Sequence, residues 1–139
     1  MFGGPVNLLG VFGVAVVSYI IGFLWYGPVF GKLWMKLSRL SANDIAKAKK
    51  KGMAGKFVLN FVGTFVSAFV FAKLIQVAGI LTAAQGAILG FWIWLGFIAA
   101  TTLLGSVLWD NKPWGLFVLN GLYWLVTLKV MGALLVLWS

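Results

Sequence analysis

Side chains that could carry acid–base or metal chemistry are scarce in this sequence. Asp44 and Asp110 are its only carboxylates, and it contains no cysteine and no histidine. General acid–base catalysis usually needs two tuned groups in one dry site, and soft metal sites need cysteine or histidine ligands. Because neither set is present, we expect no catalytic residue, no cofactor and no metal site, and we predict that the chain is not an enzyme.

Two lysines, Lys73 and Lys129, interrupt otherwise apolar stretches. A lysine at the centre of a membrane span costs about 2.5–3.5 kcal/mol on insertion scales. Each could line a cavity and attract an anionic solute or headgroup, or it could extend its ammonium along a four-carbon stem to the headgroups. We favour this snorkelling for both residues, and Lys129 is the better candidate for a cavity.

Uncharged polar and small residues form three further patterns. Asn60 and Asn120 each end a Phe-Val-Leu-Asn tetrapeptide. A hydrogen bond from such an amide to a neighbouring membrane helix typically contributes about 0.6 kcal/mol. We favour a role in helix packing over ligand binding for both residues. Gly86 and Gly90 have the four-residue spacing that lets helix backbones touch, within the chain or between copies. The hydroxyl groups of Thr101, Thr102 and Ser106 could face a pore, but such hydroxyl groups more commonly bond to their own helix.

Composition assigns these residues to a membrane environment. Hydrophobic residues make up 63% of the 139 residues, charged residues make up 9%, and the mean hydropathy is +1.06. Soluble domains carry about 25% charged residues, and a small domain has too little interior to bury so much apolar surface. We therefore expect lipid to be part of the solvent.

Four apolar stretches are long enough to cross a bilayer, since a span needs about 20 residues. The expected transmembrane helices are residues 6–26, 57–80, 84–109 and 114–138. Together they account for nearly the whole chain, which leaves no room for a separate soluble domain. The sequence predicts an all-α integral membrane protein with a single domain, residues 1–139, in which both termini lie on one side.

The remaining segment, residues 28–56, is basic and amphipathic. It holds eight of the eleven Lys and Arg residues, and its first part alternates aromatic and aliphatic residues with lysines at helical spacing. Such a segment lies in the headgroup plane. We expect a helical loop that binds lipid headgroups rather than nucleic acid. Its candidate headgroup ligands are Lys32, Lys36, Arg39, Lys47, Lys49, Lys50, Lys51 and Lys56.

The same basic loop predicts the orientation of the chain. Cytoplasmic loops of membrane proteins carry an excess of Lys and Arg. The segment before the first span and the turn at residues 76–85 carry none. We therefore expect the loop and the turn at 110–113 in the cytoplasm, and both termini outside.

An internal duplication of two helical hairpins is an open possibility. Its basis is the repeated Phe-Val-Leu-Asn tetrapeptide, together with Leu-Trp and a following proline near the ends of the first and third spans. In a chain so rich in Phe, Val and Leu, a four-residue match is weak support. If the duplication is real, it is a parallel repeat with the basic loop inserted in the first hairpin.

Two long stretches resemble a known family. GFLWYGPVFGKLWMK with the following LSANDIAKAKKKGM, and later GFWIWLGFIAATTLLGSVLWDNKPWGLFVLNGLYWL, are similar to the small bacterial membrane proteins of domain of unknown function 1761. The similarity covers nearly the whole chain. It implies a four-helix protein of a bacterial cytoplasmic membrane, and it supplies no catalytic or binding residues.

Two functions follow from these patterns. The first is a structural or regulatory membrane protein whose basic loop contacts anionic lipid of the inner leaflet. The alternative is a small-solute transporter or channel with Lys129 in its pathway. One four-helix chain is too thin to enclose a pathway, so the alternative needs a homo-oligomer. Membrane lipids and further copies of the chain are therefore the expected partners.

Overall fold

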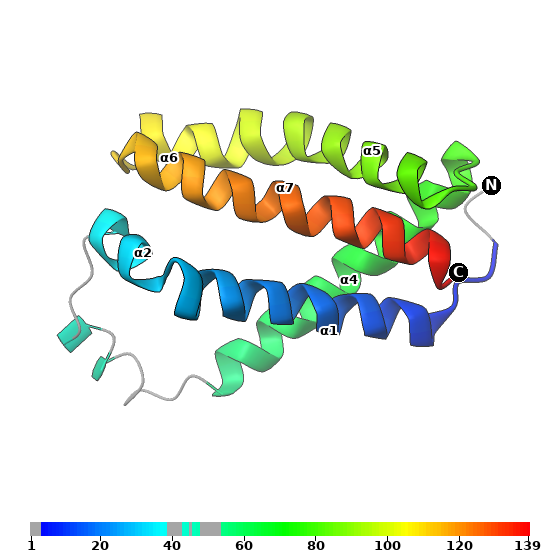
Figure 1. The fold of residues 1–139 in the computed structure, drawn as a ribbon, viewed down its shortest axis with the longest axis horizontal. Coiled ribbons are helices and arrows are strands. Elements are labelled where there is room, and N and C mark those ends of the chain that lie inside the picture. Colours follow the sequence, from blue (N-terminus) through cyan, green and yellow to red (C-terminus); the bar gives the residue numbers. More distant parts are fainter. Residues whose placement is uncertain (1–3, 39–42, 45, 48–53) are drawn as a thin grey trace.

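The computed structural model describes residues 4–38, 43–44, 46–47 and 54–139, and these residues are mainly helical (Figure 1). The first half contains α1 (Leu8–Leu24), the π-helical segment η1 (Trp25–Val29), α2 (Gly31–Ser38) and α4 (Ala54–Ala78). The second half contains α5 (Ala83–Ile93), the π-helical segment η2 (Trp94–Leu103), α6 (Leu104–Leu108) and α7 (Trp114–Leu137). The described residues contain no β-strand.

Four continuous helical stretches are long and apolar enough to cross a membrane, as the sequence predicts. They are Leu8–Val29, Ala54–Ala78, Ala83–Leu108 and Trp114–Leu137. The second stretch begins three residues before its expected start and ends before Gly79, whose φ of 69° terminates the helix. The third begins after Thr82, whose hydroxyl accepts the Gln85 N–H as an N-cap.

The four long apolar stretches run in alternating directions along the chain (Figure 1). The N-terminus, the C-terminus and the α4–α5 turn lie at one end, which we call the termini end. At the other end lie α2, the start of α4 and the turn between α6 and α7. The described parts of the expected basic segment and the turn at 110–113 thus share one end of the bundle.

The backbones of α5 and α7 are in direct contact at glycine residues, a contact that we call the glycine seam. An added Cβ at Gly86 would overlap the carbonyl group of Gly132, and the reverse also holds. One turn further, an added Cβ at Gly90 would lie 2.7 Å from the carbonyl carbon of Leu128. The four-residue spacing of Gly86 and Gly90 therefore serves packing within this chain.

The other hairpin, α1 with α4, packs through aromatic rings instead. The Phe61 ring lies edge-on to Phe12 at 5.6 Å and to Tyr19 at 5.2 Å between ring centroids. The α1–α4 pair thus has aromatic ring contacts where the α5–α7 pair has direct backbone contact. The proposed duplication of hairpins stays a prediction.

The tightest side-chain packing lies where α1, α4 and α7 meet. Val14 and Ala68 are completely buried there, and Phe71 is 3% exposed. The cluster also contains Val11, Ile75, Leu128, Met131 and Leu135. Large apolar side chains on the outward faces of all four spans remain exposed, as expected for helices surrounded by lipid.

Two π-helical segments interrupt the regular helices. In η1, Gly27 leaves helical geometry (φ −107°, ψ −105°) and Pro28 follows it. Proline has no N–H to donate and breaks a helix, so the chain bends here and turns into α2. In η2, the indole Nε1 of Trp94 donates to the carbonyl oxygen of Gly121 at 2.8 Å and ties the third span to α7. Trp94 therefore has a packing role.

Candidate functional site

The first of the basic residues lie on α2, which is attached to the bundle by its apolar side. The Trp34 ring lies edge-on to Tyr26, with centroids 5.9 Å apart. Leu37 covers Gly115 at the start of α7, where an added Cβ would lie 2.9 Å from the Leu37 Cδ2 atom. Lys32 and Lys36 are exposed. The helix is thus amphipathic, as the sequence predicts, with its packing side settled by these contacts.

Further exposed cations lie at the same end of the molecule. They lie on the described residues 46–47, in the first turn of α4 and in the turn between α6 and α7, segments that share one end with α2 in Figure 1. We call these five residues the basic end: Lys32, Lys36, Lys47, Lys56 and Lys112. Arg39, Lys49, Lys50 and Lys51, also predicted as headgroup ligands, lie outside the described residues. Asp44 and the exposed Asp110 belong to this end as well. Positive charge therefore exceeds negative charge at the basic end.

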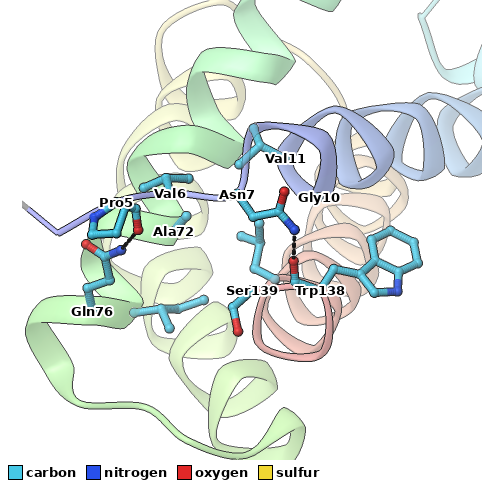
Figure 2. A pocket seen from close by; sticks show the side chains of 11 residues that line it. Pro5, Val6, Asn7, Gly10, Val11, Ala72, Gln76, Trp138 and Ser139 are labelled. Carbon is cyan, nitrogen blue, oxygen red and sulfur yellow. Dashed lines mark hydrogen bonds between the residues drawn. The ribbon is translucent and has the colours of Figure 1, made fainter.

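Lys73 lies at the termini end, where its ammonium has a protein partner. Its Nζ donates to the carbonyl oxygen of Gly4 at 2.6 Å and lies 5.7 Å from the centroid of the Phe69 ring. Beside it, the Gln76 Nε2 donates to the Pro5 carbonyl at 2.6 Å (Figure 2). The Lys73 ammonium, on α4, therefore binds the segment that precedes α1.

A small hollow lies beneath this N-terminal segment. It is bordered by Val6, Ala72 and Leu135, and the Asn7 Nδ2 donates across it to the Trp138 carbonyl oxygen at 2.7 Å (Figure 2). Its volume is about 60 Å³, whereas small-molecule sites typically have roughly 300–1,000 Å³. The hollow is therefore much smaller than a typical ligand site.

Lys129 is exposed on the outer surface of α7. Leu122 and Val126 are exposed on the same helix, and the Lys129 backbone approaches Gly90 of α5. Lys129 does not line the hollow under the N-terminal segment. It also does not line the apolar groove formed by Val16, Tyr19, Ile20, Phe23, Leu24 and Phe61. Within one chain, then, Lys129 faces outward, toward lipid or a neighbouring molecule.

Asn60 and Asn120 occupy different environments despite their matching tetrapeptides. The Tyr26 hydroxyl donates to the Asn120 Oδ1 at 2.6 Å, joining η1 to α7. Asn60 is exposed on α4, and its backbone carbonyl accepts the Thr64 hydroxyl at 3.0 Å. Two hydroxyl groups in the third span bond to their own helix: Thr101 donates to the carbonyl oxygen of Phe97 and Ser106 to that of Leu103, both at 2.8 Å.

Tyr26 and Tyr123 belong to an aromatic cluster that sequence reasoning missed. Their ring centroids lie 5.1 Å apart, and Trp25 lies 6.2 Å from Tyr123. Trp25 also stacks at 4.8 Å on Phe30, beyond the bend at Gly27 and Pro28. The only sequence signal was the interfacial position of Trp25 and Tyr26, which predicts an aromatic belt and not contact with α7. The cluster fixes the direction in which α2 leaves the bundle.

One family model matches this chain. Its description is "Protein of unknown function (DUF1761)", and the match covers residues 9–136. No curated protein and no solved structure matches the chain significantly. These matches therefore assign no activity to the chain.

Proposed function

The chain belongs to the family of proteins of unknown function DUF1761, and we propose that it has a structural or regulatory role within a bacterial cytoplasmic membrane. In this proposal the basic end contacts anionic lipid of the inner leaflet. The four apolar helices are consistent with a multi-pass membrane protein. The bacterial membrane in this proposal is what the resemblance to the family implies.

One observation carries the proposal: α2 packs by Trp34 and Leu37 while its lysines stay exposed. Because the helix is anchored at both the η1 bend and the start of α7, its lysines have a fixed place at the end of the bundle. Each Lys or Arg near an anionic surface contributes about 1 kcal/mol. Several cations on one end therefore favour anionic over zwitterionic lipid.

Charge asymmetry also supports the proposed orientation. Lys73 and Lys129 are the only cations of the described chain outside the basic end, and cytoplasmic segments carry the excess of Lys and Arg. We therefore place the basic end in the cytoplasm and both termini outside. The absence of enzymatic activity, cofactor, metal and nucleic-acid binding stays a prediction.

The alternative is a homo-oligomeric transporter or channel for a small solute, with Lys129 in the pathway. Since Lys129 lies on the outer surface of α7, such a pathway would have to run between copies of the chain. The lipid-contact role requires only contacts that one chain supplies. We therefore place it ahead of transport.

Lipid selectivity tests the proposed function. We expect the purified protein in mixed micelles to bind phosphatidylglycerol more tightly than phosphatidylcholine, as counted by native mass spectrometry. Neutralising both α2 lysines (Lys32→Gln with Lys36→Gln) should weaken phosphatidylglycerol binding, by up to roughly 30-fold if each lysine contributes about 1 kcal/mol. Neutralising Lys47, Lys49, Lys50 and Lys51 together should weaken it as well.

The matched control keeps the charge and changes the side chain. Lys32→Arg with Lys36→Arg should retain the phosphatidylglycerol preference, because both residues stay cationic. If the preference is the same in the wild-type protein and in both neutralised variants, the basic end does not select lipid and the proposal is wrong.

A further inference from the structure

We propose that the groove between α1 and α4 holds one acyl chain of an anionic phospholipid of the inner leaflet, with the lipid phosphate beside Lys56. This inference rests on the proposed function and gives it a defined binding site. It follows from the walls of the groove, from the contacts that fix its shape, and from the charge at one end.

The groove is an apolar surface depression of about 330 Å³. Its lining residues are Val16, Tyr19, Ile20, Phe23, Leu24 and Phe61. Val16 and Leu24 are eight residues apart on α1, which corresponds to about 12 Å of helix at 1.5 Å per residue. A volume of roughly 300–1,000 Å³ is typical of small-molecule sites, and these walls suit a hydrocarbon chain.

Contacts between the two helices set the shape of this groove. The Tyr19 hydroxyl donates to the carbonyl oxygen of Phe57 at 2.6 Å. The polar atom of the Tyr19 side chain is therefore already hydrogen-bonded to the protein. The edge-on contact between Tyr19 and Phe61 then fixes the position of both rings. An unfilled groove would leave its walls without dispersion partners on one side, and an acyl chain supplies them without requiring any hydrogen bond.

Charge complementarity identifies the kind of lipid. Lys56 directly precedes Phe57 and is exposed in the first turn of α4, at the basic end. The α1 wall runs from Val16 toward Leu24, that is, toward the same end (Figure 1). A phospholipid with its acyl chain along this wall would have its phosphate toward the end of the bundle at which α4 begins, the end that carries Lys56. A cation there favours an anionic headgroup over a zwitterionic one.

Photocrosslinking tests the location of the acyl chain. The full-length protein would be reconstituted in nanodiscs with a trace of phosphatidylglycerol that carries a diazirine on one acyl chain, and the modified residues would be mapped by mass spectrometry. We expect crosslinks to concentrate on the six groove residues. Unlabelled phosphatidylglycerol should compete several-fold better than phosphatidylcholine.

Two variants address the walls and the charge separately. Ile20→Trp, at a position that is 53% exposed, should fill the groove and reduce crosslinking several-fold without disturbing the core. Lys56→Gln should remove the preference between the two competitors while acyl-chain crosslinks remain in the groove. Leu122→Trp, an equal bulk change at an exposed position of α7, should leave crosslinking at the groove unchanged.

Each other outcome overturns a defined part of the inference. Crosslinks spread evenly over all exposed helix faces would show ordinary surrounding lipid and no site. Crosslinks between two protein copies through α1 and α4 would show that a second chain occupies the groove. In either case, the proposed function would still hold if the α2 lysine variants lose the preference for phosphatidylglycerol. A wild-type protein without that preference would instead remove the proposed function itself.

Discussion

Replacing Gly132 with alanine should destabilise the protein by about 1–3 kcal/mol, the usual cost of inserting a methyl group into a well-packed interior. The new Cβ would overlap the carbonyl group of Gly86 and would lie 3.0 Å from the Phe71 Cζ. A backbone carbonyl cannot turn aside as a flexible side chain can, so α5 and α7 would have to separate. The free energy of unfolding, measured by SDS titration in mixed micelles, checks this.

Two other glycines in the spans provide matched controls. Gly63 in α4 and Gly96 in η2 have no neighbouring atoms within 4 Å of an added Cβ. Since alanine favours a helix over glycine by up to about 1 kcal/mol, Gly63→Ala and Gly96→Ala should be neutral or stabilising. Equal losses at Gly132, Gly63 and Gly96 would show that the α5–α7 seam is not the close contact described here.

Truncating Phe71 to alanine should have the largest effect of any single side-chain deletion, about 3–5 kcal/mol. Phe71 is 3% exposed and extends from α4 to the glycine seam at Gly132. Its removal leaves a cavity where α1, α4 and α7 meet. Lipid around the bundle does not offset this loss, because the cost comes from absent packing partners.

The control for Phe71 is an aromatic residue that faces outward. Phe97 is 73% exposed on η2, so Phe97→Ala should change the unfolding free energy by less than about 0.5 kcal/mol. The same micelle titration compares the two variants. Similar losses for both would mean that the central cluster does not hold α4 against the rest of the bundle.

Sequence reasoning located the spans because length and hydropathy alone decide which segments cross a bilayer. It could not settle which side of each span faces the bundle. A soluble helix marks its inner face by an apolar stripe, but these spans are apolar on every side. The spacing of Gly86 and Gly90 therefore predicted a close contact, while the choice of Gly132 and Leu128 as partners required the structure.

The same limit explains why the partners of the candidate polar residues could not be predicted from the sequence. Asn60 and Asn120 share a tetrapeptide, yet the rotation of each helix turns Asn60 outward and Asn120 toward Tyr26. For Lys73 the sequence favours snorkelling to the headgroups, and the structure adds a protein partner, the Gly4 carbonyl. That partner belongs to a non-helical segment whose path no periodicity predicts. The amphipathic α2 was predictable because its lysines and its apolar residues do lie on separate faces.

The membrane orientation of the two ends tests the central claim most directly, and the chain suits this test because it contains no cysteine. Single variants Ser38→Cys at the basic end and Ser139→Cys at the termini end would be treated with a membrane-impermeant maleimide in bacterial cells expressing the protein, with the outer membrane opened where there is one. We predict labelling of Ser139→Cys in cells with an intact cytoplasmic membrane, and of Ser38→Cys only after that membrane is permeabilised. Labelling of Ser38→Cys before permeabilisation would contradict the account, because the basic end would then lie outside the cell.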